Sequence, residues 1–309
     1  MPHQSRRVIA RVYGGLGNQM FMYAAGYALA RRMQLPLTID ARTGFRGDPY
    51  QRGFDLGNFS ITARQAGTDD LGYFRGISSG GCGRFWRKAV RAAARMGVLP
   101  NTTFLVEKSP RILDQRMFAA DAQGNVYVDG YWQDERYFIE YAEELRAEFL
   151  SAKTPGPGSV AIAEDMARHQ AVAVHVRTML PKPSLPIDYY LESVRHLCER
   201  LEGIKVYFFA DNPDHEFDLS RFNVPVANIA ALKLSSCEDL SLMTQCKHHV
   251  IANSSFSWWG AWLSGERGRL VVAPDWTEWP PHAVRPAAGW TQLGRESFAG
   301  SEQLQSLSA

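Results

Sequence analysis

Short apolar runs alternate with helix-forming segments along the chain. Near the N-terminus, a β-prone run at residues 7–13 precedes a glycine-rich loop at residues 14–18, and residues 35–40 form a second β-prone run. Between the loop and the second run, the alanine-rich sequence predicts a helix over residues 19–33. Strand, loop, helix and strand in this order make up the βαβ unit of α/β proteins with parallel sheets.

A further strand is predicted at residues 126–130, and the same rhythm restarts in the second half of the chain. Strands are predicted there at residues 171–176, 205–210, 249–252 and 270–274, and helices at residues 188–201, 237–246 and 256–264. The segment at residues 151–159 holds two prolines and two glycines, which cannot sustain a helix or a strand. We therefore predict a linker there, between an N-terminal lobe at residues 1–150 and a C-terminal lobe at residues 160–309.

Composition narrows the classes of protein. The chain has 309 residues, of which 45% are apolar and 21% charged, with a net charge of +2. These values argue against a disordered chain, and the charge is too small to indicate a nucleic-acid partner. The four cysteines lie far apart without a CxxC pair, which argues against a zinc ribbon or a disulfide framework. No apolar run suits a signal peptide or a membrane span, so we expect a cytoplasmic protein.

One segment is strongly basic. Residues 75–116 hold nine Lys or Arg residues against two acidic ones, and residues 84–96 can form a helix that carries Phe85 and Trp86. Cations beside aromatic residues suggest peripheral docking at the inner face of the membrane, where a lipid-linked acceptor would lie. The alternative is a solvated helix that packs on its own lobe, and the sequence leaves both open.

Polar side chains stand at the ends of three predicted strands of the second half. They are His175 and Arg177 at the end of the first, Asp211 after the second, and Asn253, Ser254 and Ser255 after the third. Ligands of parallel sheets bind at the carboxyl ends of the strands, and the start of a helix suits a phosphate. An arginine can add a two-pronged contact to the same anion. Together these features predict a pocket for a nucleotide diphosphate that requires no metal.

Each feature also has a structural alternative. Asn and Ser are ordinary N-cap residues, and a lone histidine at a strand end often makes only a structural hydrogen bond. The loop at residues 14–17 is not a GxGxxG motif, so a dinucleotide reading is weak. Trp258, Trp259 and Trp262 could form a sugar platform, but their helical spacing favours core packing.

Several long motifs resemble one known family. Residues 14–24, GGLGNQMFMYA, closely resemble the opening signature of the α-1,2-fucosyltransferases, glycosyltransferase family 11. Residues 242–260 resemble the C-terminal signature of that family, and residues 129–138 its central element. The resemblance runs from about residue 8 to residue 276, with the motifs in the same order.

The resemblance implies a fold and an activity. The fold would be GT-B-like, an α/β fold with two Rossmann-like lobes that face a cleft. The C-terminal lobe would bind the GDP-sugar, and the N-terminal lobe, with its glycine-rich loop, would face the acceptor. The reaction would be the inverting transfer of L-fucose from GDP-L-fucose, without a cofactor or divalent metal. The product would be an α-1,2 linkage to a sugar hydroxyl, usually of galactose, on an oligosaccharide or a lipid-linked surface glycan.

The chemistry of this transfer assigns a role to each candidate residue. Negative charge grows on the β-phosphate as GDP leaves, so we expect Arg177 to be the main catalytic cation, assisted by Ser254, Ser255 and Phe256. Four residues of the glycine-rich loop would also bind the donor: Gly14, Gly15, Gly17 and Asn18. His175 and Asp211 would lie nearer the ribose or guanine, and Asn253 would belong to the phosphate-binding start of the helix. No carboxylate stands out as the base that deprotonates the acceptor.

The sequence departs from the family pattern at one position. The family usually continues His-Val-Arg with a second arginine, whereas here Thr178 follows Arg177. The loss of one cation leaves two alternatives open: a transferase for another GDP-sugar, or a protein that binds a sugar nucleotide without turnover.

Overall fold

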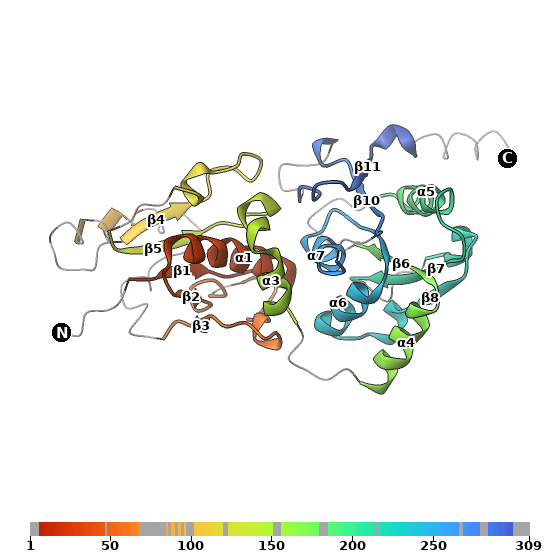
Figure 1. The fold of residues 1–309 in the computed structure, drawn as a ribbon, viewed down its shortest axis with the longest axis horizontal. Helices are drawn as coiled ribbons and strands as arrows, with labels where there is room; N and C mark the ends of the chain where they lie inside the picture. The colour runs from red at the N-terminus through yellow and green to blue at the C-terminus, as the bar shows by residue number, and fades with distance from the viewer. Residues whose placement is uncertain are drawn as a thin grey trace. The chain divides into compact units, whose positions relative to one another are not determined.

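The computed structural model describes two compact units of the chain. The described residues are 6–46, 48–67, 102–119, 123–150, 156–178, 185–212, 217–265, 268–278 and 284–298, with positions 85, 88, 89, 92, 93, 96 and 214. The first unit is Met1–Ala152 and the second Lys153–Ala309. Each contains one parallel sheet with helices packed on it (Figure 1). The predicted linker falls at the division, and the binding roles of the two lobes stay predictions.

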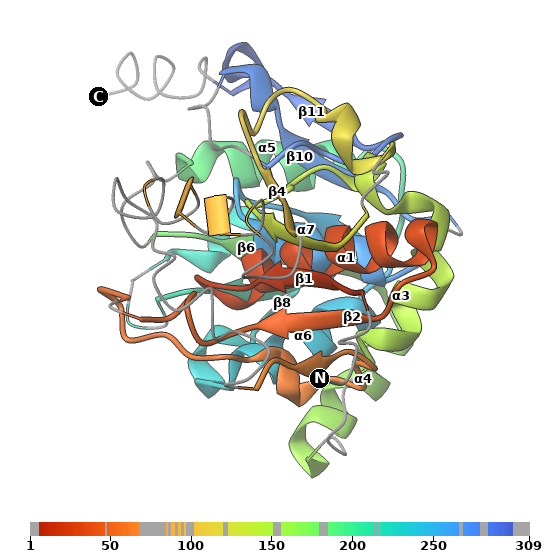
Figure 2. The same cartoon turned by 90° about the vertical axis from the view of Figure 1, so that its left-hand side faces the viewer.

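The first unit has a sheet with the strand order β3-β2-β1-β5-β4, and all of these pairings are parallel. The strands are β1 (Val8–Arg11), β2 (Leu37–Asp40), β3 (Arg64–Gln65), β4 (Thr102–Val106) and β5 (Asn125–Asp129). Its helices in the described residues are α1 (Leu16–Met33) and α3 (Ala142–Glu148). Figure 2 looks onto this unit, with β1 beside β2.

Helix α1 lies directly against β1. A Cβ added at Gly26 would approach the Cβ of Ala10 to 2.7 Å, so only glycine allows this closeness. The apolar residues of the helix are buried almost along its whole length. This packing holds the loop between β1 and α1 firmly at the carboxyl end of the central strand.

The second unit has a sheet with the strand order β11-β10-β9-β6-β7-β8, again parallel throughout. The strands are β6 (Gln170–Val176), β7 (Ile204–Ala210), β8 (Val226–Asn228), β9 (His248–Val250), β10 (Val271–Pro274) and β11 (Thr291–Leu293). The helices are α4 (Pro157–Ala167), α5 (Ile187–Cys198), α6 (Ser236–Gln245) and α7 (Ser255–Leu263).

The two faces of the second sheet bury different side chains of β6. Val172 and Val174 pack on one face together with Tyr189 of α5. Ala171 and Ala173 pack on the other face together with Met243 of α6. Strand β6 is covered on both sides, which explains its apolar sequence.

The tryptophans of α7 belong to the core. Trp258, Trp259 and Trp262 are each at most 1% exposed. Trp258 and Trp262 stack with ring centroids 5.8 Å apart. Helical spacing therefore predicted their role correctly, and they offer no exposed sugar platform.

The predicted helices and strands are present, with shifted ends. The helix expected from residue 19 begins at Leu16, because Gly15 already takes the N-cap position. The linker prediction is wrong for its last residues: Pro157 stands at the start of α4, where its missing N–H costs nothing. The basic segment at residues 84–96 lies mostly outside the described residues, so membrane docking stays a prediction. No described helix is long and apolar enough to cross a membrane.

Candidate functional site

The three predicted groups of polar residues lie at one edge of the second sheet. Strand β6 pairs with β7 up to Val176 and Ala210, and with β9 up to Val174 and Val250. Because all three strands are parallel and adjacent, the residues that follow them emerge at the same edge. The sequence-predicted residues His175, Arg177, Asp211, Asn253, Ser254, Ser255 and Phe256 are thus brought together.

His175 is a buried anchor between β6 and α7. Its Nδ1 shares a hydrogen bond of 2.6 Å with Ser257 Oγ, and its ring packs against Phe256 with centroids 5.3 Å apart. Burial lowers the pKa of His175 to about 4; the Asp211 carboxylate opposes this shift and the Arg177 guanidinium adds to it. The imidazole is therefore neutral near pH 7, and its Nδ1 already has a partner.

Asp211 holds the turn that carries Arg177. One oxygen of its carboxylate accepts the Thr178 backbone N–H at 2.8 Å and the Thr178 hydroxyl at 3.2 Å. The Asp211 N–H in turn donates to the Val176 carbonyl at 3.3 Å. Thr178, which stands where the family has a second arginine, therefore ties the end of β6 to the end of β7.

The Arg177 guanidinium has hydrogen-bonding capacity that the described residues leave unused. Its Nε is buried and has no hydrogen-bond partner, and no ion pair joins Arg177 to another described residue. A buried N–H on a guanidinium costs free energy unless something accepts it, so this side chain carries an unsatisfied donor.

Ser254 stands at the N-cap of α7 without acting as a cap. Its hydroxyl makes no hydrogen bond to the helix, although the residue is only 2% exposed. An ordinary N-cap serine accepts a backbone N–H from the first turn. Asn253 is used differently, since its side-chain oxygen accepts the Val284 N–H at 3.3 Å. The start of α7 therefore offers a hydroxyl, and it carries the partial positive charge of a helix N-terminus.

The glycine-rich loop belongs to the first unit. Gly14 has φ +75°, a conformation that favours glycine, and Gly15 is the N-cap of α1 without a side-chain cap. Gln19 Nε2 donates to the carbonyls of Gly14 and Gly53, each at 2.9 Å. Asn18 Oδ1 accepts from Gln133 Nε2 at 2.8 Å. The loop is thus rigidly held, and its contact with a donor stays a prediction.

Sequence reasoning missed a buried polar network at the carboxyl edge of the first sheet. Arg11 pairs with Asp129 at 3.2 Å and donates to Thr43. Asp40 in turn accepts from Thr43 and from the Tyr127 hydroxyl. Each of the three predicted strands carries a charged residue at or near its end, Arg11, Asp40 and Asp129, and these residues could have indicated the network. In the second unit, the partnerships of Thr178 and Ser257 were also missed, because they join segments far apart in the chain.

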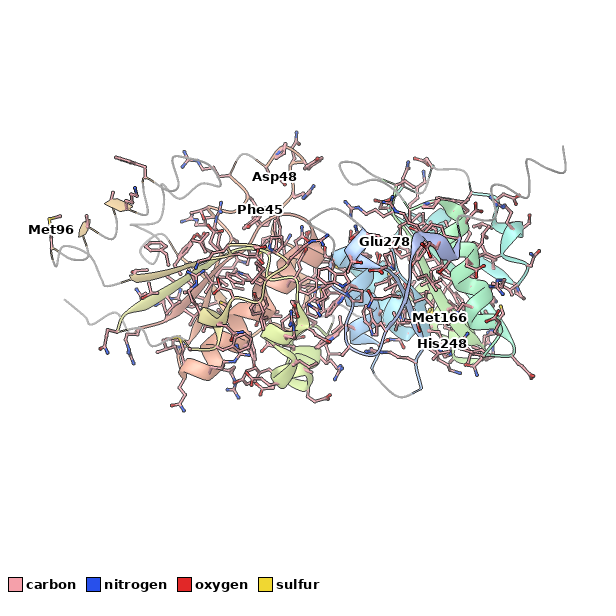
Figure 3. The ribbon with its side chains drawn as sticks, turned by 90° about the horizontal axis from the view of Figure 1, so that it is seen from above. Phe45, Asp48, Met96, Met166, His248 and Glu278 are labelled. Atoms are coloured by element: carbon pink, nitrogen blue, oxygen red, sulfur yellow. The ribbon has the colours of Figure 1, made fainter. Side chains whose placement is uncertain are left out.

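The two adjacent histidines of β9 lie away from this edge. His248, labelled in Figure 3, bonds Gln170 at the amino end of β6, with Nε2 and Oε1 3.2 Å apart. His249 Nε2 instead bonds the Met243 carbonyl. Within the described residues, no group of three or more His, Cys, Asp or Glu side chains could hold a metal ion.

Comparison with known proteins identifies the family. The model for glycosyl transferase family 11 matches residues 108–292. The chain belongs to glycosyltransferase family 11. A curated relative from Escherichia coli, an α-1,2-colitosyltransferase, is 29% identical, covering 88% of this chain and 92% of its own. A second, the O-antigen biosynthesis glycosyltransferase WbnK from Escherichia coli, is 26% identical, covering 84% and 91%.

A solved structure supports the fold. A mutant of Arabidopsis thaliana FUT1 in complex with GDP matches with a TM-score of 0.50 at 11% identity, covering 88% of this chain and 71% of that chain. The predicted α/β fold of the GT-B type is confirmed, and the family 11 protein is a glycosyltransferase.

Proposed function

We propose that this family 11 glycosyltransferase moves L-fucose from GDP-L-fucose to a sugar hydroxyl, giving an α-1,2 linkage to galactose in a surface glycan. The proposal rests on two buried polar groups that lack hydrogen-bond partners and that follow the neighbouring strands β6 and β9. Arg177 after β6 has a buried Nε without a partner, and Ser254 after β9 has a buried hydroxyl without one. A diphosphate supplies acceptors for both.

The reaction needs charge stabilisation at the leaving group. The bond between the fucose anomeric carbon and the β-phosphate oxygen breaks while the acceptor oxygen bonds to that carbon from the opposite face. GDP leaves with the bonding electron pair, and the acceptor hydroxyl loses its proton to the departing diphosphate. Arg177 and the first N–H groups of α7 would stabilise the growing phosphate charge. His175 is neutral and held by Ser257, so it adds no charge to this step.

Thr178 leaves Arg177 as the one arginine of this motif, where the family has two. The threonine compensates structurally, because its N–H and hydroxyl occupy the Asp211 carboxylate. We infer that one arginine, held in place by Asp211 and Thr178, is sufficient for turnover.

The direct test replaces Arg177 and a matched arginine at the other edge of the same sheet. Arg177→Ala should lower fucosyl transfer from labelled GDP-L-fucose to lactose-type acceptors by about 10²–10³-fold. Arg200→Ala removes an exposed cation that follows α5, bonded only to His196 O and Glu199 among the described residues. This control should keep full activity. Near-normal transfer by folded Arg177→Ala would refute the proposal.

A second donor deserves the same assay because a relative from Escherichia coli is an α-1,2-colitosyltransferase. Colitose is L-fucose without its 3-hydroxyl, so both donors can share one diphosphate site. Competition between GDP-L-fucose and its 3-deoxy analogue measures the preference directly. If GDP raises the unfolding temperature while neither sugar is transferred to any acceptor tested, the protein binds a sugar nucleotide without turnover.

A further inference from the structure

Arg285 is a half-buried cation that no described carboxylate neutralises. Its guanidinium carbon lies 5.0 Å from the centre of the Trp276 ring. Within the described residues, no ion pair or hydrogen bond joins this guanidinium to another side chain. An aromatic ring attracts a guanidinium through its π electrons but leaves the positive charge in place. The contact with Trp276 therefore fixes a cation without cancelling its charge.

The main chain around Arg285 is fixed to the start of helix α7. The Val284 N–H donates to the Asn253 side chain at 3.3 Å, and Trp258 Nε1 donates to the Arg285 carbonyl at 3.0 Å. Further along the same segment, Trp290 packs on Trp258 with ring centroids 5.6 Å apart. Asn253 directly precedes the N-cap of α7, and Trp258 lies in the first turn of the helix. Arg285 is thus held beside the first turn of α7.

The position of Arg285 is at the carboxyl edge of the second sheet. Strand β10 pairs in parallel with β9, which pairs in turn with β6. Trp276 follows β10 and Ser254 follows β9, so both lie at the edge where Arg177 follows β6. The Arg285 main chain is fixed beside the end of β9, and its guanidinium lies over the residue that follows β10. The cation therefore stands near the ends of both strands.

The two acidic residues nearest to Trp276 in the chain are engaged by other groups. Asp275 Oδ1 accepts the Thr277 N–H at 2.8 Å and the Thr277 hydroxyl at 2.7 Å. Glu278 Oε2 accepts the Arg295 N–H at 2.7 Å. Neither carboxylate forms an ion pair with Arg285. The charge of Arg285 is left for an anion from outside the protein.

Charge balance identifies the anion that suits this cation. Each phosphate of a sugar nucleotide carries a negative charge, and the terminal phosphate gains a further one as the nucleotide leaves. Arg177 and the partial positive charge at the start of α7 offset only part of this charge. The motif at the end of β6 adds no second cation, because Thr178 follows Arg177. A guanidinium presents paired N–H donors that match two phosphate oxygens.

We propose that Arg285 binds the diphosphate of the sugar nucleotide as a second cation, beside Arg177 and the first turn of α7. This inference rests on the proposed function, which places the diphosphate at Arg177 and Ser254. It explains how one arginine in the motif after β6 can suffice, because the second charge comes from the segment after β10. Trp276 is then the residue that positions the Arg285 guanidinium.

The test measures GDP binding by calorimetric titration of the full chain in low and in high salt. Arg285→Met should weaken GDP binding about 10-fold in low salt, because it removes a charge-assisted hydrogen bond to the diphosphate. The loss should shrink in high salt, since dissolved ions screen the attraction that the wild type has and the variant lacks. Arg285→Lys keeps the positive charge and should bind GDP more tightly than Arg285→Met.

Arg269→Met is the matched control, because Arg269 also lies over a tryptophan of the same unit. Its guanidinium carbon is 5.8 Å from the centre of the Trp290 ring, and its Nη1 donates to the carbonyls of Ala261 and Trp262, in the last turn of α7. This variant loses hydrogen bonds of the folded chain, so its unfolding temperature should fall further than that of Arg285→Met. Its affinity for GDP should equal that of the wild type.

The outcomes separate this inference from the proposed function. A wild type that binds no GDP overturns both. If Arg177→Ala weakens GDP binding and Arg285→Met does not, the role of Arg285 alone is wrong. It is also wrong if Arg285→Met raises only the KM for the acceptor, which would assign the cation to the acceptor. If Arg285→Lys binds GDP no better than Arg285→Met, the arginine is structural and the proposal fails.

Discussion

Two arginines at equivalent places in the two units differ in their surroundings. At the end of β1, the Arg11 guanidinium is buried against Asp129, at 3.2 Å, and against the hydroxyl and carbonyl of Thr43. After β6, the Arg177 guanidinium keeps a buried Nε without a partner among the described residues. The first arginine is satisfied within its own unit, and the second is not.

The other polar groups at the two edges differ in the same way: those of the first are hydrogen-bonded, and those of the second include unpartnered groups. Around Arg11, the Asp40 carboxylate accepts from Thr43 and Tyr127. At the carboxyl edge of the second sheet, to which Arg177 belongs, the Ser254 hydroxyl and an Asp239 oxygen are buried without partners. The division has an exception, because the buried Nε1 of Trp132 at the first edge also lacks a partner. Paired charges fix the shape of an edge, whereas unpaired ones cost stability and are retained where a ligand completes them.

The largest effect on stability is expected from breaking the satisfied pair. Asp129→Ala leaves the Arg11 charge buried, with a side chain 2% exposed, and should lower the free energy of unfolding by about 3–5 kcal/mol. Glu143→Ala breaks an exposed pair with Arg146 and should cost less than about 1 kcal/mol. Urea unfolding measures both. Equal costs would show that the Arg11 pair is no more important than a surface contact.

The sequence was sufficient to bring the candidate residues of the second unit to one edge. If the sheet is parallel, the ends of the strands that lead to Arg177, Asp211 and Asn253 must lie at the same edge, and the apolar run of β6 indicated a parallel sheet. The start of α4 was not predictable by the same reasoning, because Pro157 and Gly158 break helices everywhere except in the first turn.

The contacts that tune the site could not be predicted from the sequence. Ser257 meets His175 from 82 positions away, and Gln133 meets Asn18 from 115 positions away. Helix α6 packs closely on α7, with Met243 against Gly260, although 17 positions separate them in the chain. In the sequence, Asp239 is indistinguishable from an acidic residue that favours the start of a helix. Only the tertiary structure separates a satisfied carboxylate from an unsatisfied one.

Two aspartates of the second unit should respond to pH in opposite directions. The pKa of Asp239 is raised by burial to about 7, so the wild type loses stability as the pH rises from about 4 to 7. Asp239→Asn should therefore gain about 1–3 kcal/mol over the wild type at pH 8, and this gain should vanish near pH 4.

Asp165 provides the opposite case in the same unit. Hydrogen bonds from Lys205 and Tyr207 lower its pKa to about 2, so its stabilisation is complete above about pH 4 and is lost as the pH falls toward 2. Asp165→Asn should be less stable than the wild type near neutral pH, and the difference should shrink in acid. Thermal unfolding from pH 3 to pH 8 measures both variants. Parallel pH profiles for the two would remove the distinction between satisfied and unsatisfied carboxylates.

The smallest effect is expected from the two serines at the ends of α7. The Ser254 hydroxyl has no partner, so Ser254→Ala should change the free energy of unfolding by less than about 0.5 kcal/mol. The Ser264 hydroxyl donates to the Ala261 carbonyl at 2.8 Å, so Ser264→Ala should cost about 0.5–1.5 kcal/mol. The order should reverse for GDP affinity, which Ser254→Ala lowers about 2- to 10-fold and Ser264→Ala leaves unchanged. If Ser254→Ala were the less stable variant and bound GDP normally, its hydroxyl would be an ordinary helix cap. The second edge would then be as self-contained as the first.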